Sequence, residues 1–243
     1  MLSLKDFKLK RLLVATLVSA TLIGTAYLLG WSSVLSVNSV AVEGTSSQLE
    51  IMRKLNADSI ELSVGSKLAR VEPRAVAKSV EMLDWIDQVK VSRNWLGRSV
   101  KISVVEKQAV AKSVSIKDGL INFDASGAIF KPVSIKQLSI QKQLPLVIVA
   151  EDEKSLLASV ATLLSQLPPK SSELVVNLKS ISVSSSGLIQ METSIRAQSL
   201  QINWGLARDI ALKVRVLNAL LKLPENKDIS RVDLSQPELP IVS

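Results

Sequence analysis

Residues 89–104 read VKVSRNWLGRSVKISV, and this stretch decides the fold of the first half of the chain. Valine and isoleucine alternate with lysine and serine on both sides of a central NWLG segment. Strict alternation is typical of strands with one buried and one wet face, and Asn and Gly favour a turn between them. The stretch therefore predicts two antiparallel strands joined by a tight turn.

Helical patterns precede this hairpin. A helix is expected from Pro73, a residue suited to the first helical turn, to about Leu83, with apolar residues at three- and four-residue steps. A weaker helix is expected over Gln48–Leu55, and a short strand over Val37–Val42 before Gly44. The order β-α-α-β-β closes a compact unit over residues 37–107.

Residues 108–243 predict a second, β-rich domain with two helices, so the fold class is α+β. The helices are expected over Lys154–Leu167, which ends at Pro168–Pro169, and over Leu206–Leu221. Alternating or short aliphatic runs predict the strands, near 110–116, 119–123, 129–130, 144–149, 174–178, 181–183, 188–192, 200–204 and 229–234.

The first 31 residues predict a membrane anchor. The segment Leu12–Trp31 contains no charged side chain and would span about 30 Å as a helix, which is the thickness of a bilayer's hydrocarbon core. Residues 1–11 are a basic tail, and basic residues stay on the cytoplasmic side, so we expect the N-terminus inside and the rest outside. A cleaved secretory signal is the disfavoured alternative, because the apolar run is long and Tyr27 follows the small residues.

The composition argues against an enzyme. The chain has no His and no Cys, which removes the commonest general base, the thiol nucleophile and the usual zinc ligands. The Ser-x-x-Lys motif Ser139–Lys142 is expected in a polar connector, without the companion motifs that its catalytic use needs. No Gly-rich phosphate loop occurs, and no basic tract with interleaved aromatic residues indicates nucleic acid. We expect no cofactor and no small-molecule substrate.

Several other residues admit both a functional and a structural interpretation. Glu106, next to Lys107, is expected to end a strand or pair locally, and Trp85 and Trp95 to pack rather than form a recognition patch. Asp124 begins a turn that ends in Gly127, so we interpret it as a turn residue rather than a catalytic carboxylate. The acids at 151–153 are expected to complement the dipole of the following helix rather than bind a cation.

The ordered set of these segments resembles the FtsQ/DivIB family of bacterial cell division proteins, and the first unit resembles a POTRA domain. The resemblance covers roughly residues 1–243. The segments that carry it are 37–44, 83–86, 89–95, 100–111, 120–130, 144–145 and 232–240. Asp84, Leu96 and Ala109 depart from it, because proline is usual at these positions in the family.

This resemblance implies a single-pass protein of the plasma membrane at the division septum. Residues 1–11 would be a cytoplasmic tail, 12–31 the transmembrane helix, 37–107 the POTRA domain and 108–243 the C-terminal domain. It implies a divisome scaffold that links early and late division proteins, with FtsB- and FtsL-like proteins as partners. The alternative is a POTRA-bearing membrane-assembly or transport factor.

The resemblance also places partner recognition at the C-terminal strand and the helix before it. We predict that the expected last strand, Ile229–Leu234, has a free edge, and an edge strand can accept another chain. A basic rim on the helix, including Lys213 and Lys222, is expected to orient an acidic partner segment. The residues assigned to the partner site are Arg208, Arg215, Arg231, Val232, Asp233, Leu234 and Ser235.

Overall fold

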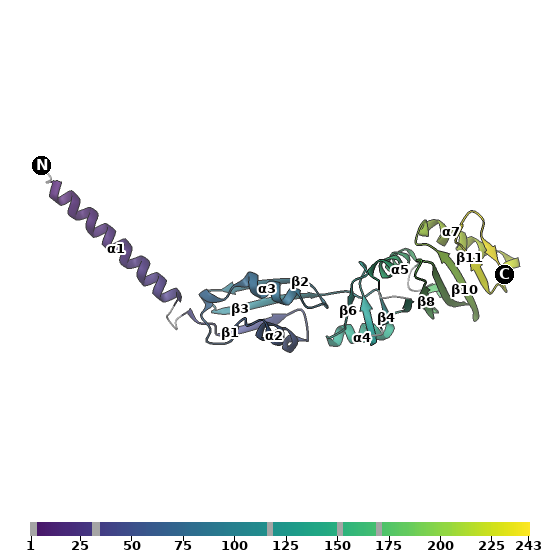
Figure 1. Ribbon diagram of the computed structural model, residues 1–243, viewed down its shortest axis with the longest axis horizontal. Helices are drawn as coiled ribbons and strands as arrows, with labels where there is room; N and C mark the ends of the chain where they lie inside the picture. Colours follow the sequence, from purple (N-terminus) through teal and green to yellow (C-terminus); the bar gives the residue numbers. More distant parts are fainter. Residues whose placement is uncertain (1–3, 31–34, 116–118, 150–152, 169–171) are drawn as a thin grey trace. The chain divides into compact units, whose positions relative to one another are not determined.

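The computed structural model describes residues 4–30, 35–115, 119–149, 153–168 and 172–243. Helices and strands are mixed throughout, which confirms the α+β class (Figure 1). The chain forms two compact units, residues 1–106 and residues 107–243. Each unit is described by itself below.

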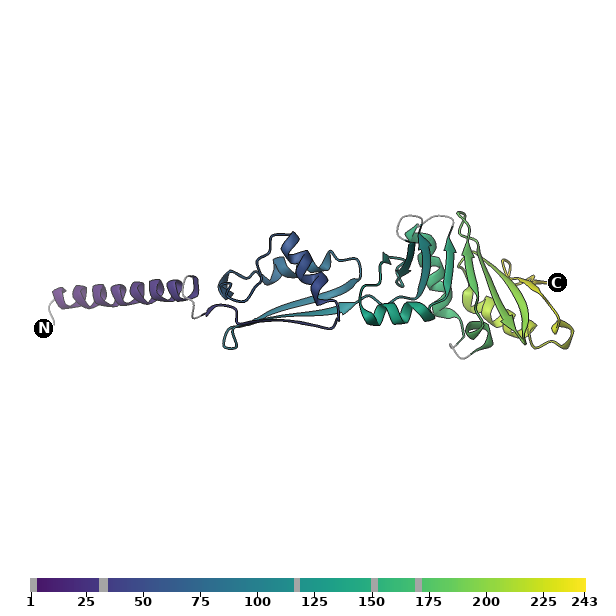
Figure 2. The ribbon, with the colours of Figure 1, turned by 90° about the horizontal axis from the view of Figure 1, so that it is seen from below.

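Unit 1 contains a small three-stranded sheet with two helices packed on one of its faces (Figure 2). Strand β1 pairs parallel with β3, and β2 pairs antiparallel with β3, which gives the spatial order β1-β3-β2. After an N-terminal helix α1, its elements are β1 (Ser39–Glu43), α2 (Gln48–Ala57), the 3-10 turn η2 (Leu68–Arg70), α3 (Pro73–Glu81), β2 (Ile86–Asn94) and β3 (Ser99–Glu106).

The core of unit 1 follows the alternation that the sequence displays. Val100, Ile102 and Val104 of β3 are buried, while the polar residues between them are exposed or half-buried. Helix α3 presents Val76 and Val80 to the sheet, and its first turn begins at Pro73 as predicted. Trp85 is buried, which confirms its packing role.

Helix α1 runs from Leu4 to Gly30, and its side chains are described from Leu12 to Tyr27. All of these side chains are exposed. No helix in the described part of the chain is long and apolar enough to cross a membrane. The predicted anchor over residues 12–31 therefore stays a prediction, and Trp31 at its end lies outside the described residues.

Unit 2 is built on one sheet whose described strands follow the order β12-β11-β10-β9-β8-β7-β4-β5-β6. The strands are β4 (Ala111–Ser115), β5 (Gly119–Phe123), β6 (Ile129–Phe130), β7 (Leu146–Val149), β8 (Ser180–Val183), β9 (Ile189–Ile195), β10 (Gln198–Gly205), β11 (Arg231–Asp233) and β12 (Ile241–Val242). The helices are α4 (Ile135–Gln143), α5 (Lys154–Gln166), α6 (Glu173–Val176) and α7 (Ile210–Leu220), followed by the 3-10 turn η3 (Pro224–Asn226).

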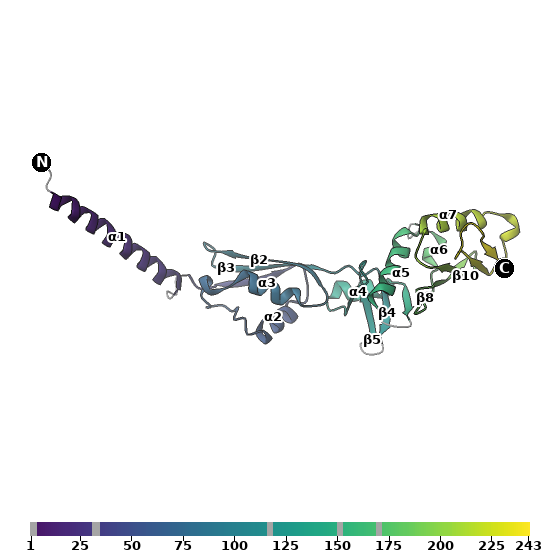
Figure 3. The same ribbon diagram turned by 45° about the horizontal axis from the view of Figure 1, so that its top comes forward.

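Helices α5 and α7 cover one side of this sheet (Figure 3). Leu157 and Val160 of α5 and Leu217 of α7 share one core with Ile202 and Trp204 of β10. The predicted turn residue Asp124 is confirmed as structural, because it accepts hydrogen bonds from Ser126 and from the backbone N–H of Ala128. Burial raises the pKa of Asp124, but these hydrogen bonds, together with the charge of Lys107, hold it below its usual value.

Three elements of unit 2 differ from the sequence-based expectation. The predicted polar connector that holds Ser139 and Lys142 is helix α4, and the Ser139 hydroxyl donates to the carbonyl oxygen of Lys136. The predicted strand over 174–178 is the short helix α6. The described part of this unit therefore contains four α-helices rather than two, and one more strand, β12, follows the strand expected to be last.

Candidate functional site

Strand β11 and the two residues after it carry five of the seven residues that the sequence assigned to a partner site. Strands β9 and β10 form an antiparallel hairpin, and β11 adds parallel to β10, with Val232 beside Ile202. Gly205 at the end of β10 has a φ of +62°, and an added Cβ there would lie 2.9 Å from the Cα of Ser235. Glycine is thus needed for the segment after β11 to approach β10 closely.

Two of the predicted site residues are core residues. Val232 and Leu234 are completely buried and pack in the same cluster as Ile210, Leu217 and Trp204. Their side chains face α7 and are not available to a partner. The assignment of these two side chains to a contact surface is therefore corrected.

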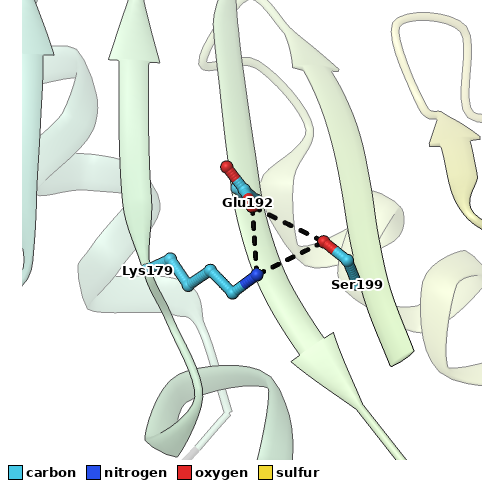
Figure 4. Close-up of polar contacts among 3 residues, drawn as sticks. All are labelled: Lys179, Glu192 and Ser199. Atoms are coloured by element: carbon cyan, nitrogen blue, oxygen red, sulfur yellow. Dashed lines mark hydrogen bonds and ion pairs between the residues drawn. The ribbon is translucent and has the colours of Figure 1, made fainter. Parts of the chain in front are cut away.

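The opposite face of strands β9, β10 and β11 is polar and largely exposed, and Figure 4 shows Lys179, Glu192 and Ser199 close together. The Lys179 ammonium group lies 3.1 Å from the Glu192 carboxylate and 3.4 Å from the Ser199 hydroxyl. Arg231 donates from Nε and Nη2 to the side-chain oxygen of Gln201, at 3.2 and 3.1 Å. Because side chains alternate along a strand, Arg231 faces this open side while Val232 faces the core.

Part of this polar face forms a shallow hollow of about 430 Å³. Its lining residues are Glu192, Ser199, Gln201, Ser230, Arg231 and Ser243. Both signs of charge and several hydroxyl and amide groups meet here, so the surface suits recognition of a polar chain segment. No group of three or more acidic side chains in the described residues is arranged to hold a metal ion.

Asp233 is anchored where β11 ends. Its carboxylate accepts hydrogen bonds from the backbone N–H and hydroxyl of Ser235, at 2.8 and 2.6 Å, and from the Asn203 amide at 2.8 Å. Burial raises the pKa of Asp233, but these hydrogen bonds and the charge of Lys213 outweigh burial and lower it from the usual 3.8. Asp233 therefore fixes the turn after β11 rather than offering a charge to a partner.

This arrangement makes a pH-dependent prediction for Asp233→Asn. A carboxylate whose pKa is lowered in the folded state stabilises the fold above its unfolded pKa, and that contribution is lost as the pH falls through the folded pKa. We expect the variant to be less stable than the parent at pH 7, with the difference shrinking below about pH 4. Urea unfolding of the full chain across this pH range measures it, and a difference that does not change with pH would contradict the assignment.

Lys213 was expected on an exposed basic rim, and this is wrong. Its side chain is 3% exposed, and Nζ donates to the carbonyl oxygens of Trp204 and Leu206 at 2.6 and 3.0 Å. Burial lowers the pKa of Lys213, although the charges of Asp209, Asp233 and Glu238 act in the opposite direction. Lys213 links α7 to the end of β10 through these hydrogen bonds, and its charge is not exposed to a partner.

The remaining basic residues do not form one rim with Arg231. Arg208, Arg215 and Lys222 are exposed, but Arg215 lies on the outer side of α7. Helix α7 covers the core face of the sheet, whereas Arg231 lies on the open face. The structure therefore brings Arg231 together with Glu192 and Gln201, and leaves Arg208 and Arg215 elsewhere.

The predicted free edge of β11 is also wrong, because β12 covers it. Strand β12 pairs antiparallel with β11, with Val242 beside Val232 and Ile241 beside Asp233. The backbone N–H of Arg231 donates to the Ser243 carbonyl oxygen at 2.9 Å, and that of Ser243 donates to Arg231 at 3.1 Å. In the described part of the sheet, the edge at this end is β12.

Sequence reasoning missed the exposed apolar residues beside this edge. The side chains of Leu239 and Ile241 are 73% and 68% exposed. The sequence does show aliphatic residues around Pro237 and Pro240. The two prolines, however, favoured an irregular tail rather than a strand. We define the C-terminal edge site as Leu239 to Ser243 together with the polar hollow.

A family comparison identifies this part of the chain. Residues 117–235 match the family model of the C-terminal domain of the cell division protein FtsQ/DivIB. The matched range contains strands β5 to β11 and both large helices of unit 2. A comparison with curated proteins finds no match. By this C-terminal domain, the chain belongs to the FtsQ/DivIB family of cell division proteins.

Proposed function

We propose that this cell division protein is a non-enzymatic scaffold of the divisome that binds FtsB- and FtsL-like proteins outside the cytoplasm. The observation that carries the proposal is the C-terminal edge site, where the short edge strand β12 contains exposed Ile241 and exposed Leu239 lies two residues before it. An edge strand can accept a strand from another chain, with backbone bonds supplying affinity and side-chain contacts supplying specificity. Arg231, in the adjoining hollow, would orient an acidic segment of the partner.

We also propose that residues 12–31 anchor the chain in the plasma membrane, with residues 1–11 in the cytoplasm. The apolar side chains from Leu12 to Tyr27 are exposed around the helix. The hydroxyls of Thr16, Thr21 and Thr25 donate to backbone carbonyl oxygens four residues earlier, so these polar groups are satisfied within the helix. Internal satisfaction of polar groups is what a lipid environment requires.

The proposed role of unit 1 is that of a POTRA domain over residues 37–107. Its β-α-α-β-β order and its sheet order β1-β3-β2 support this proposal. The anchor would confine both partners to the membrane plane, and this confinement raises their effective concentration, so contacts of modest affinity suffice.

Purification of the tagged full chain from membranes tests the proposed function. FtsB- and FtsL-like proteins are expected among its companions, and Arg231→Glu, a surface change, is expected to lower their recovery more at low salt than at high salt. Lys222→Glu is the matched control, because Lys222 is exposed but lies outside the C-terminal edge site. Companions that belong to membrane assembly or transport, with no division protein among them, would contradict the proposal in favour of the alternative.

A further inference from the structure

Three segments of unit 1 meet where the chain enters its first strand. The backbone N–H of Val37 donates to Ser66 at 2.8 Å, and that of Gly65 donates back to Val37 at 2.8 Å. The backbone N–H of Asn38 donates to Arg98 at 2.6 Å. We call residues 36–38, 63–70 and 93–98 the basic loop cluster, which includes the tip of the β2–β3 hairpin.

The basic loop cluster exposes apolar side chains. Leu96 is 99% exposed at the hairpin tip, Trp95 beside it is exposed, and Val64 is exposed in the neighbouring loop. The tip is a defined turn, because the Asn94 side-chain oxygen accepts from the Gly97 N–H at 2.8 Å. Leu96 thus projects from an ordered turn rather than from a loose chain, and no core contact explains its apolar character.

The charge of the cluster has one sign. It contains Lys67, Arg70, Arg93 and Arg98 and no acidic residue. Arg93 donates to the Val71 carbonyl oxygen at 3.0 Å and stacks over the Trp95 ring at 5.1 Å, which joins the hairpin to the adjacent turn.

The opposite end of the same sheet is acidic. Strand β1 ends at Glu43, β3 ends at Glu106, and Asp84 and Asp87 lie beside the start of β2. Strand β1 runs parallel to β3 and antiparallel to β2, so these acids gather at the end away from the hairpin tip. The basic loop cluster therefore lies at the end of unit 1 that carries Trp95 and Leu96, away from these acidic residues.

We propose that the basic loop cluster docks on an anionic lipid surface, with Trp95 and Leu96 in the interfacial layer of the bilayer. Tryptophan favours this layer, and each lysine or arginine near an anionic surface adds to its attraction. The proposal rests on the proposed anchor, which ends only seven residues before Asn38. Seven residues span at most about 25 Å, so the cluster is held within reach of the membrane surface.

A spin label at a single site tests the docking, because the chain has no native cysteine. Leu96→Cys places the label at the hairpin tip, and Met82→Cys is the matched control, since Met82 is 70% exposed and follows α3, close to the acidic end. Leu22→Cys reports on the anchor. The full chain is reconstituted in phosphatidylcholine vesicles with and without phosphatidylglycerol, and collisions with oxygen and with a water-soluble nickel chelate give the depth of each label.

In phosphatidylglycerol vesicles we expect the Leu96 label to be shielded from nickel and accessible to oxygen, while the Met82 label stays in water. Arg98→Gln, added to Leu96→Cys, is expected to reduce the membrane-docked fraction about fivefold in these vesicles. A Leu96 label as exposed to nickel as the Met82 label would overturn the docking proposal. Failure of the anchor would be seen separately, as a Leu22 label in water.

Discussion

Gly44→Ala is expected to destabilise unit 1 selectively, and Gly127→Ala is expected to destabilise unit 2 selectively. Gly44 has a φ of +91°, and a Cβ there would lie 2.0 Å from the Val104 carbonyl oxygen. Gly127 has a φ of +78°, and a Cβ there would lie 2.2 Å from the Lys154 carbonyl oxygen and 2.7 Å from the Ala158 nitrogen. In both places the obstacle is backbone, which cannot move aside cheaply.

The expected loss of stability is about 2–5 kcal/mol for the affected unit. Left-handed backbone costs a residue with a Cβ about 1–2 kcal/mol, and overpacking costs about 1–3 kcal/mol more. Gly65→Ala and Gly119→Ala are the matched controls, because both glycines have positive φ but no atom within 4 Å of the added Cβ. The control variants should therefore lose only the stability that left-handed backbone costs, about 1–2 kcal/mol.

Hydrogen exchange read by mass spectrometry measures the two units of the full chain separately. In Gly44→Ala, exchange should accelerate in residues 39–106 and stay unchanged in residues 107–243, and Gly127→Ala should give the reverse. Equal acceleration in both units by either variant would mean that they unfold as one, and would contradict the division into two units.

The sequence predicted best where the signal is local. The alternation around Val91 and Ile102 is confirmed as the antiparallel pair β2–β3, because period-two burial specifies both strand and register. Helix α5 is also confirmed within a residue, since its apolar stripe and the following prolines define its end. These elements need no knowledge of distant partners.

Helix α4 was not predicted, because its polar side chains are buried and its apolar side chains are exposed. Its polar residues Gln137 and Gln141 are buried, while Ile135 and Leu138 are exposed. The Gln141 side chain donates to the Asn122 side-chain oxygen at 3.0 Å, and Gln137 accepts from the Val133 N–H at 3.0 Å. Hydrogen bonding rather than apolar burial positions this helix, and a hydrophobic pattern cannot reveal that.

The details of the C-terminal strands and of helix α7 were not predicted, for reasons of the same kind. Strand β12 has only two residues, and its pairing with β11 spans a turn with two prolines. Lys213 lies three residues after Ile210 and four before Leu217, on the buried stripe of α7. A lysine is expected at the surface, and only the nearby carbonyl oxygens of Trp204 and Leu206 explain its burial.

The other large effect is expected for Val242→Pro at the C-terminal edge site. In an antiparallel pair, hydrogen-bonded and non-hydrogen-bonded residue pairs alternate. Arg231 and Ser243 exchange both backbone bonds, so Val232 and Val242 form a non-hydrogen-bonded pair. The backbone N–H and C=O of Val242 therefore point away from β11, toward a strand that would add at this edge.

Proline at position 242 removes that outward N–H without removing a bond to β11, and edge strands tolerate proline in this orientation. The partner would lose one backbone bond and keep an unpaired carbonyl group at the contact, which costs about 1–3 kcal/mol. We expect partner affinity to fall roughly fivefold to a hundredfold, with the fold retained. Val242→Ala is the control, because it shortens the same side chain but keeps the N–H.

The most direct test of the account is partner recovery on three tagged full-length chains, the parent, Val242→Ala and Val242→Pro, each with its melting curve. We expect that only Val242→Pro loses the FtsB-like partner, while all three chains remain folded and membrane-bound. Recovery by a folded Val242→Pro chain that equals recovery by the parent would contradict docking at this edge.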